Sequence, residues 1–399
     1  MGTENDVGRI EFANTLRGFS ALFVLVCHYF VVFWLARDVV STDIYAPILS
    51  FQTFPTPTYV ALLNPTVLFD WGAYGVALFF LISGFVIPFS FKKTDWKGFI
   101  ANRFFRIFPT YIVGFSITLT AIWLSCLYFN VGFPLHTKEI IFHYIPGLHD
   151  IIYSKDIDGV IWTLEIEVKF YLICAIVASF FRAQRRRVFL IPVFLFVSAF
   201  FLNSKIGVLA YVGEFAFNIS AAYVFTSQYI IFMFIGVTFN YYFRKVIDFK
   251  YTMFLIVLLF FFFYLLSKNN FYHPSFHLIW SYVFALVTFI FAYANPKLFK
   301  GNIISNFLAD ISYPLYVTHA IGGYVLLRVF LDLGLKPGLS LLIATSVAIG
   351  LSTFIHRYVE VPSHKFGRRV SAKITSKLIV NPFANTARNL KQINRIDIN

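Results

Sequence analysis

Ionisable side chains lie inside the apolar runs of this chain, where they are costly and usually mark a function. The first run places Arg17 and His28 eleven positions apart. At ~1.5 Å per residue, His28 lies roughly 16 Å further along a helix than Arg17. If Arg17 lies at one edge of a hydrocarbon core about 30 Å thick, His28 is past its middle. We expect His28 to act as a general base or proton relay; the alternatives are an interfacial arginine and a hydrogen-bonded core histidine.

Two arginines precede the third apolar run. Arg103 and Arg106 are three residues apart and share one face of a helix, and Pro109 suits the first turn of the helix that follows. Guanidinium groups match phosphate oxygens in bidentate fashion. The pair therefore predicts a site for a phosphorylated cytosolic molecule, with ordinary anchoring at the membrane surface as the alternative.

A fourth apolar run carries three charged residues, Glu165, Glu167 and Lys169. Glu165 and Lys169 are four apart and can neutralise each other. Counted from the outer end of its helix, Glu167 lies roughly 9 Å below the outer membrane surface, and His28 lies about 12 Å below it. A carboxylate beside an imidazole orients it and raises its basicity. We therefore predict that Glu167 pairs with His28 or with the acceptor, and a hydrogen bond between packed helices is the alternative.

Further polar residues suit supporting roles. Ser83 and Gly84 permit close helix packing, which is the favoured interpretation for both. Tyr313 and His319 lie in the ninth apolar run, and His319 is a second titratable group. Glu360, at the inner end of the last run, is predicted to pair with a cytoplasmic arginine in a structural or cofactor-side role.

Composition assigns the chain to integral membrane proteins. Of its 399 residues 59% are hydrophobic and only 13% are charged, against about 25% charged in soluble domains. We therefore predict an all-α, polytopic membrane bundle of about ten helices. The predicted spans are 16–36, 73–90, 108–129, 161–181, 188–203, 224–243, 251–267, 275–294, 311–331 and 338–356. The stretch 205–223 is either a re-entrant segment or an eleventh span.

The basic residues indicate the orientation. With the N-terminus inside, inner segments hold 25 of the 33 lysines and arginines. The positive-inside rule then places both termini in the cytoplasm, and the net charge of +14 reflects topology rather than nucleic-acid binding. We expect a transmembrane domain over residues 1–369 and a basic, weakly ordered tail over 370–399. The expected location is the inner (cytoplasmic) membrane.

Motifs of soluble enzymes are absent from the sequence. It holds no Walker motif, His-Glu-x-x-His, Gly-x-Ser-x-Gly or dinucleotide fingerprint. The three cysteines, Cys27, Cys126 and Cys174, offer no metal spacing or disulfide framework. No metal is therefore expected.

The chain resembles the acyltransferase-3 family of membrane O-acyltransferases through six pieces in order. They are Arg17-(x10)-His28, Gly75 to Phe85, Arg103-x-x-Arg106-Ile107-x-Pro109, Trp162-Thr163-Leu164-x-x-Glu167-x-x-Phe170-Tyr171, Ile311-Ser312-Tyr313-x-Leu315-Tyr316-x-x-His319 and Tyr358-Val359-Glu360-x-Pro362.

This resemblance implies transfer of an acyl group, usually acetyl, from cytoplasmic acyl-coenzyme A to a hydroxyl on the far side of the membrane. The implied acceptor is a cell-surface polysaccharide such as O-antigen or exopolysaccharide, although some relatives modify small molecules. In this scheme Arg17, Arg103 and Arg106 hold the coenzyme A phosphates, and His28, oriented by Glu167, is the general base. Direct transfer and a covalent acyl-enzyme both stay open, as do the acyl chain and the oligomeric state. The competing hypothesis is a proton-coupled transporter or flippase of a glycan or small molecule.

Overall fold

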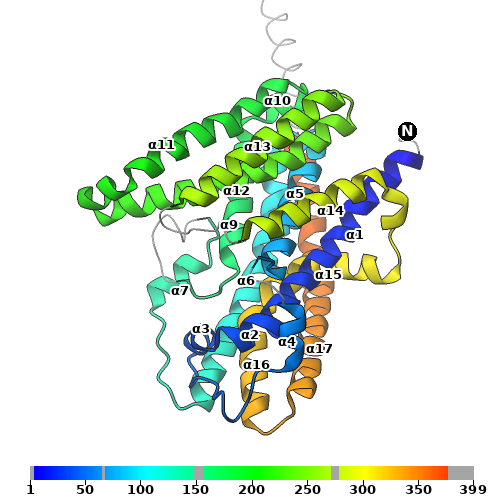
Figure 1. The fold of residues 1–399 in the computed structure, drawn as a ribbon. Coiled ribbons are helices and arrows are strands. Elements are labelled where there is room, and N and C mark those ends of the chain that lie inside the picture. Colours follow the sequence, from blue (N-terminus) through cyan, green and yellow to red (C-terminus); the bar gives the residue numbers. More distant parts are fainter. Residues whose placement is uncertain (1–3, 65–67, 93, 148–155, 271–277, 376–399) are drawn as a thin grey trace, which may run out of the picture.

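A computed structural model describes residues 4–64, 68–92, 94–147, 156–270 and 278–375. Within these ranges the chain folds into helices and connecting loops, without a strand (Figure 1). The first half contains α1 Glu4–Val26, η1 Cys27–Val32, α2 Phe33–Leu35, α3 Arg37–Asp43, α4 Thr58–Leu63, α5 Trp71–Ser90, α6 Trp96–Tyr128, α7 Thr137–His143, α9 Ile161–Ile176 and α10 Ala178–Arg182. The second half contains η2 Arg186–Phe189, α11 Leu190–Val212, α12 Glu214–Phe243, α13 Phe249–Asn269, α14 Ile279–Ala294, η4 Pro296–Phe299, α15 Ile303–Thr318, α16 Ala320–Asp332, α17 Pro337–Ile355 and η5 His356–Glu360.

The predicted class, an all-α membrane bundle, is confirmed. Seven helical segments are long and apolar enough to cross a membrane, and the pair α15–α16, bent by 73°, makes an eighth if it is one span. Two further predicted spans coincide with shorter helices, α14 and α9, of 16 residues each. A helix needs about 20 residues to cross a bilayer, so these two are short for that task.

Backbone contact between α5 and α12 forms the centre of the bundle. A Cβ atom on Gly84 would lie 1.9 Å from the carbonyl oxygen of Met233, and one on Gly236 would lie 2.2 Å from that of Leu81. Only glycine lets two helices approach this closely. The predicted packing role of Gly84 is therefore confirmed, and α12 is the most buried of the candidate spans.

The third predicted span begins earlier than expected. Helix α6 starts at Trp96, where the carboxylate of Asp95 accepts hydrogen bonds from the backbone of Lys97 and Gly98. Pro109 therefore lies inside the helix rather than in its first turn, which corrects the prediction. Residues 96–106 extend the helix before its apolar part, and Lys97, Asn102, Arg103 and Arg106 interrupt their hydrophobic pattern, so hydrophobicity alone did not reveal the start.

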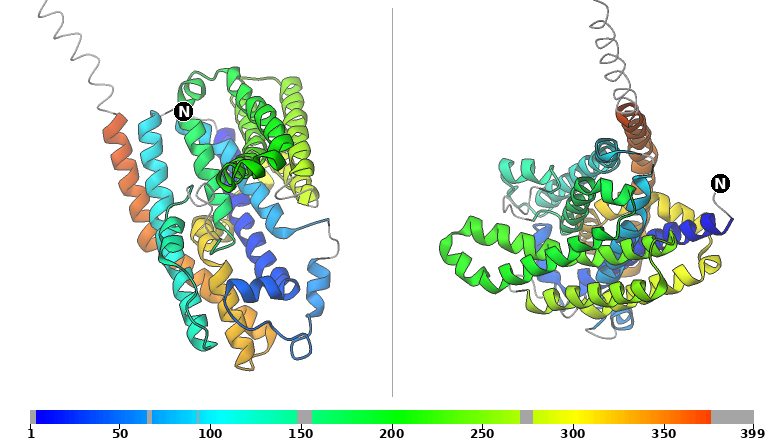
Figure 2. Two further views of the ribbon diagram at one scale, coloured as in Figure 1. Left: turned by 90° about the vertical axis from the view of Figure 1, so that its left-hand side faces the viewer. Right: turned by 90° about the horizontal axis from the view of Figure 1, so that it is seen from above.

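The last helix packs along the start of α6 (Figure 2, left). It continues past the π-helical turn η5 as far as Thr375, whose hydroxyl donates to Asp95 at 3.1 Å. The phenyl rings of Phe366 and Phe105 lie 5.0 Å apart. The boundary predicted at residue 369 thus falls within a packed helix, and the rest of the predicted tail, 376–399, lies outside the described residues.

The ambiguous stretch 205–223 forms the tip of a helical hairpin. It comprises the end of α11, a turn at Gly213 with φ of 152°, and the start of α12. Figure 1 shows α11, α12 and α13 lying side by side as a layer that is tilted against α6 and α17. The stretch is therefore neither a separate re-entrant segment nor an additional helix.

Helix α9 begins inside the protein, not at its outer surface. Its first turn is capped by Asp158, whose carboxylate accepts from the backbone N–H of Ile161 at 2.9 Å. Asp158 is 1% exposed and lies 3.8 Å from the equally buried imidazole of His143. Ile157 and Asp158, just before α9, are therefore buried in the bundle, and residues of α9 lie deeper than their position in the sequence predicts.

The contact between α5 and α12 yields a stability prediction. We expect Gly84→Ala to lower the free energy of unfolding by about 1–3 kcal/mol, because the new methyl group forces two backbones apart. The matched control is Gly350→Ala in α17, where a Cβ would meet nothing within 4 Å. Thermal unfolding in detergent measures both variants, and equal midpoints would contradict the packing described here.

Candidate active site

Five helices line a cavity of about 220 Å³ that contains three arginines. They are α1, α5, α6, α9 and α15. The polar lining comprises Asn14, Arg17, Ser83, Arg103, Arg106, Tyr111, Thr163, Glu167, Tyr171, Ser312, Tyr313 and Tyr316. The volume is below the ~300–1,000 Å³ of sites that enclose a whole small molecule. The cavity therefore suits one arm of a larger ligand.

The three arginines predicted as an anion site all line this cavity. Arg103 and Arg106 project from the same face of α6, as their spacing predicts. The guanidinium of Arg103 donates to the Ser90 hydroxyl at 2.9 Å and lies 5.2 Å from the ring of Tyr171. Its Nε is buried and has no partner among the described residues. Such a donor set, with one buried donor free, suits an anionic oxygen group.

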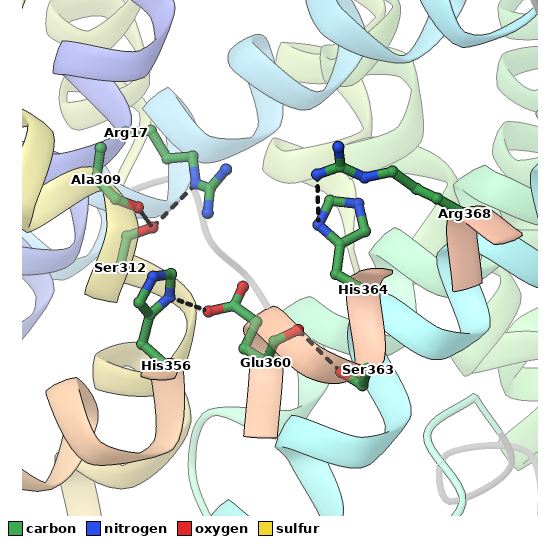
Figure 3. A network of polar contacts seen from close by, with 8 residues as sticks. All are labelled: Arg17, Ala309, Ser312, His356, Glu360, Ser363, His364 and Arg368. Carbon is green, nitrogen blue, oxygen red and sulfur yellow. Dashed lines mark hydrogen bonds and ion pairs between the residues drawn. The ribbon is translucent and has the colours of Figure 1, made fainter. Parts of the chain in front are cut away.

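Arg17 is held in the cavity rather than exposed to lipid. Its Nε donates to the hydroxyl of Ser312 at 2.9 Å, and that hydroxyl donates to the carbonyl of Ala309 (Figure 3). Arg106 and Glu360 are close enough for their charges to act on Arg17. The alternative of an interfacial arginine directed to the membrane surface therefore does not hold.

Of the two partners predicted for Glu167, His28 or the acceptor, His28 is wrong. The carboxylate of Glu167 accepts from the hydroxyl of Ser83 at 3.0 Å and from the hydroxyl of Tyr171. It lies in the arginine-lined cavity, whose lining does not include His28. The depth estimate failed because α9 begins inside the bundle. Glu167 thus partly balances the charge of the three arginines.

A second polar cluster borders the same region on the last helix (Figure 3). Glu360 accepts from Nδ1 of His356 at 2.8 Å, so its predicted arginine partner is replaced by this histidine. Both residues belong to the π-helical turn η5, and they are four positions apart, a spacing that places two side chains on one face of a helix. One turn further on, Arg368 donates to Nδ1 of His364 at 3.4 Å, and the charges of Arg17, Arg103 and Arg106 act on this imidazole.

His28 belongs to a separate centre formed with two other residues. It lies in the π-helical turn η1, and its Nδ1 is 2.6 Å from the hydroxyl of Tyr324. The ring of His319 meets the ring of His28 edge to face, with centroids 4.9 Å apart. π-helical turns are rare and frequently occur at functional sites. Tyr324 therefore takes the orienting position that the sequence assigned to Glu167.

His319 lies at the point where the ninth predicted span breaks. Helix α15 ends at Thr318, and α16 leaves it at an angle of 73°. Nδ1 of His319 lies 2.9 Å from the carbonyl of Leu315 and 3.0 Å from that of Tyr316. Because carbonyls only accept, Nδ1 carries the proton in the neutral ring. Nε2 is then a bare acceptor, and it is buried without a partner among the described residues.

Tyr316 separates the two centres. Its ring lines the cavity and lies 6.0 Å from the ring of His319, and its hydroxyl is 2.7 Å from that of Thr163. Sequence reasoning missed both Tyr316 and Tyr324 as site residues. Tyr316 stood in a recognised motif, three positions before His319, whereas Tyr324 had no signal because only the 73° bend brings it to His28.

Comparisons with known proteins agree with this architecture. The acyltransferase-3 family model, described as an acyltransferase domain, matches residues 10–357. Nodulation protein 10 of Rhizobium leguminosarum bv. viciae is 32% identical over 141 residues, which are 31% of this chain and 38% of that protein. A protein of Acidianus two-tailed virus, provisionally named an acetyltransferase, is 28% identical over 265 residues, which are 64% of this chain and 74% of that protein. No solved structure gives a significant match.

The helix break generates a prediction about local stability. The buried hydroxyl of Tyr29 donates to the carbonyl of His319 at 2.8 Å. We expect Tyr29→Phe to remove this hydrogen bond while the carbonyl keeps the Gly323 N–H, at a cost of about 0.5–1.5 kcal/mol, and to speed deuterium uptake around residues 316–324. Tyr358→Phe, at a largely exposed position, is the control. Unchanged uptake in Tyr29→Phe would show that the break does not depend on this hydrogen bond.

Proposed function

The chain belongs to the acyltransferase-3 family, and we propose that it transfers an acetyl group from cytoplasmic acetyl-coenzyme A to a hydroxyl group on the other side of a membrane. The observation that carries this proposal is the arrangement of two polar centres in one apolar bundle. Tyr316 lines the arginine-lined cavity, and the ring of His319, which contacts the ring of His28, lies 6.0 Å from the ring of Tyr316.

The arginine centre provides the means to bind the donor. Arg17, Arg103 and Arg106 present three guanidinium groups against one cavity carboxylate, Glu167. This excess of positive charge favours phosphate groups, which guanidinium binds in bidentate fashion. The limited volume suits the pantetheine arm with its thioester, while the nucleotide stays at the basic rim. His364 and Arg368 add donors at that rim.

The histidine centre provides the base. With Nδ1 directed to the hydroxyl of Tyr324, His28 keeps Nε2 for the substrate. His28 would remove the proton of the acceptor hydroxyl as the oxygen attacks the thioester carbon. The new ester forms as the carbon–sulfur bond breaks, and coenzyme A leaves as the thiol.

Delivery of the thioester requires Tyr316 to move. Its ring lies between the cavity and His319, and the hydrogen bond to Thr163 holds it there. A side-chain rotation at this position would join the two centres. The closed arrangement also separates the donor from water when no acceptor is bound, which limits wasteful hydrolysis.

We propose a cell-surface polysaccharide, such as O-antigen or exopolysaccharide, as the acceptor, and the inner (cytoplasmic) membrane as the location. The asymmetry of basic residues supports a cytoplasmic side for the arginine cavity. Mass spectrometry of surface glycans from cells with and without the gene tests the acceptor. Loss of an acetyl group from a defined sugar is the expected result, and identical glycans would exclude this acceptor class.

Removal of the proposed base should abolish transfer. We expect His28→Ala to lower the rate of acetyl transfer by about 10²–10⁴-fold, the usual contribution of a general base, without loss of expression. The measurement is acetyl transfer from radiolabelled acetyl-coenzyme A by the purified protein. His136→Ala, at an exposed position outside the site, should retain the wild-type rate. Full activity of a folded His28→Ala protein would remove His28 from the mechanism.

Removal of an arginine should weaken donor binding. Hydrogen bonds to charged groups are worth about 1.5–3 kcal/mol, so Arg103→Ala or Arg106→Ala should raise KM for acetyl-coenzyme A by about 10- to 100-fold. The control, Arg187→Ala, removes an exposed arginine that does not line the cavity. Steady-state kinetics separate KM from kcat. An equal rise in KM for Arg187→Ala would point to a general surface-charge effect.

A further inference from the structure

The proposed transfer leaves a proton and a sulfur anion on opposite sides of the reacting carbon. The hydroxyl approaches from the side of His28, and the thioester arrives from the cavity beyond Tyr316. An unpaired anion inside an apolar bundle has a high free energy, because it has lost its hydration by water and gained no partner in exchange. The sulfur must therefore receive a proton locally as it departs.

His319 occupies the position from which this proton could be supplied. It is 1% exposed and lies between the ring of His28, at 4.9 Å, and the ring of Tyr316, at 6.0 Å. Its Nδ1–H is committed to the carbonyls of Leu315 and Tyr316. Its Nε2 is therefore an acceptor fixed by the fold, buried and without a partner among the described residues. A purely structural histidine at the helix break needs only its Nδ1–H.

We propose that His319 is a second catalytic residue that relays the proton from His28 to the departing sulfur; this proposal rests on the transfer reaction proposed above. The O–H bond of the acceptor breaks as its proton passes to Nε2 of His28 and the oxygen–carbon bond forms. The proton then passes to Nε2 of His319 and on to sulfur as the carbon–sulfur bond breaks. Both imidazoles end neutral, and the products are an ester and a free thiol.

The relay makes a prediction that a structural role does not. An aliphatic thiolate is a strong base and needs a proton to leave, whereas an aromatic thiolate is stabilised by its ring. Loss of the relay should therefore lower the rate of transfer from an alkyl thioester far more than the rate from an aryl thioester. Loss of the base should lower the transfer rate with both donors, because both reactions need the hydroxyl to lose its proton.

His319→Asn separates the two roles of this side chain. The amide N–H of asparagine can take the place of the Nδ1 donor to Leu315 and Tyr316, but asparagine has no acceptor where Nε2 lies. The purified full chain in lipid nanodiscs would be assayed with S-acetyl-N-acetylcysteamine or phenyl thioacetate as donor. Methyl glucoside would be the hydroxyl acceptor, and ester formation the readout. His28→Asn is the matched variant of the first base.

We expect His319→Asn to lose at least about 10²-fold in rate with the alkyl donor, the lower range for proton-transfer catalysis, and to approach the wild-type rate with the aryl donor. His28→Asn should lose activity with both donors. Recovery with phenyl thioacetate would also show that the His319→Asn protein is folded. Wild-type activity of His319→Asn with both donors would overturn the relay and leave a structural role.

Equal losses with the two donors, at an unchanged unfolding midpoint, would also overturn the relay. If the midpoint of His319→Asn falls, His319→Gln is measured with the same two donors and judged by the same rule. Failure of the proposed function is distinguished from failure of the relay by the wild-type protein. If the proposed function is wrong, the wild-type protein releases no thiol from acetyl-coenzyme A and forms no ester.

Discussion

A helix that breaks inside an apolar bundle must keep its backbone carbonyls hydrogen-bonded, and at His319 backbone and side-chain donors together serve three of them. The carbonyl of Tyr316 accepts from Nδ1 of His319. The carbonyls of Leu315 and His319 keep backbone donors, the N–H groups of His319 and Gly323, and accept in addition from Nδ1 of His319 and from the Tyr29 hydroxyl. Non-helical backbone at membrane depth is tolerated only where such partners exist. The same contacts fix the tautomer of His319, direct α16 so that Tyr324 reaches His28, and place the two imidazoles together.

The protein keeps its positive charge and its histidine pair apart. The arginines and Glu167 lie in the cavity at the basic end, where each charge has a partner or is available to a ligand. The histidines lie beyond Tyr316, and the part of the chain that the structure describes gives them no carboxylate as a hydrogen-bond partner. This separation suits a reaction in which an anionic donor is bound on one side and a neutral hydroxyl is activated on the other. It also explains why one cavity does not contain every predicted site residue.

Predictions from local spacing succeeded, and those from depth did not. Arg103 and Arg106 share a cavity face because residues three apart always do so in a helix. Gly84 packs against the backbone of α12 because no side chain intervenes. The His28–Glu167 pair failed because its depth estimate assumed that α9 begins at the outer surface, whereas the chain enters the bundle as a buried loop at Asp158. Glu360 pairs with His356 instead of an arginine because the two residues are four positions apart on the same helix.

The sequence by itself determined the membrane class, the helical segments and the residues that carry charge into the bundle, because hydrophobicity and the period of a helix are properties of neighbouring residues. The tertiary structure alone decided which of these residues meet. The bend at His319, the buried start of α9 and the position of Tyr316 between two centres all depend on contacts between segments far apart in the chain. Such contacts arise from packing and from the need to satisfy buried backbone groups, and neither leaves a periodic trace in the sequence.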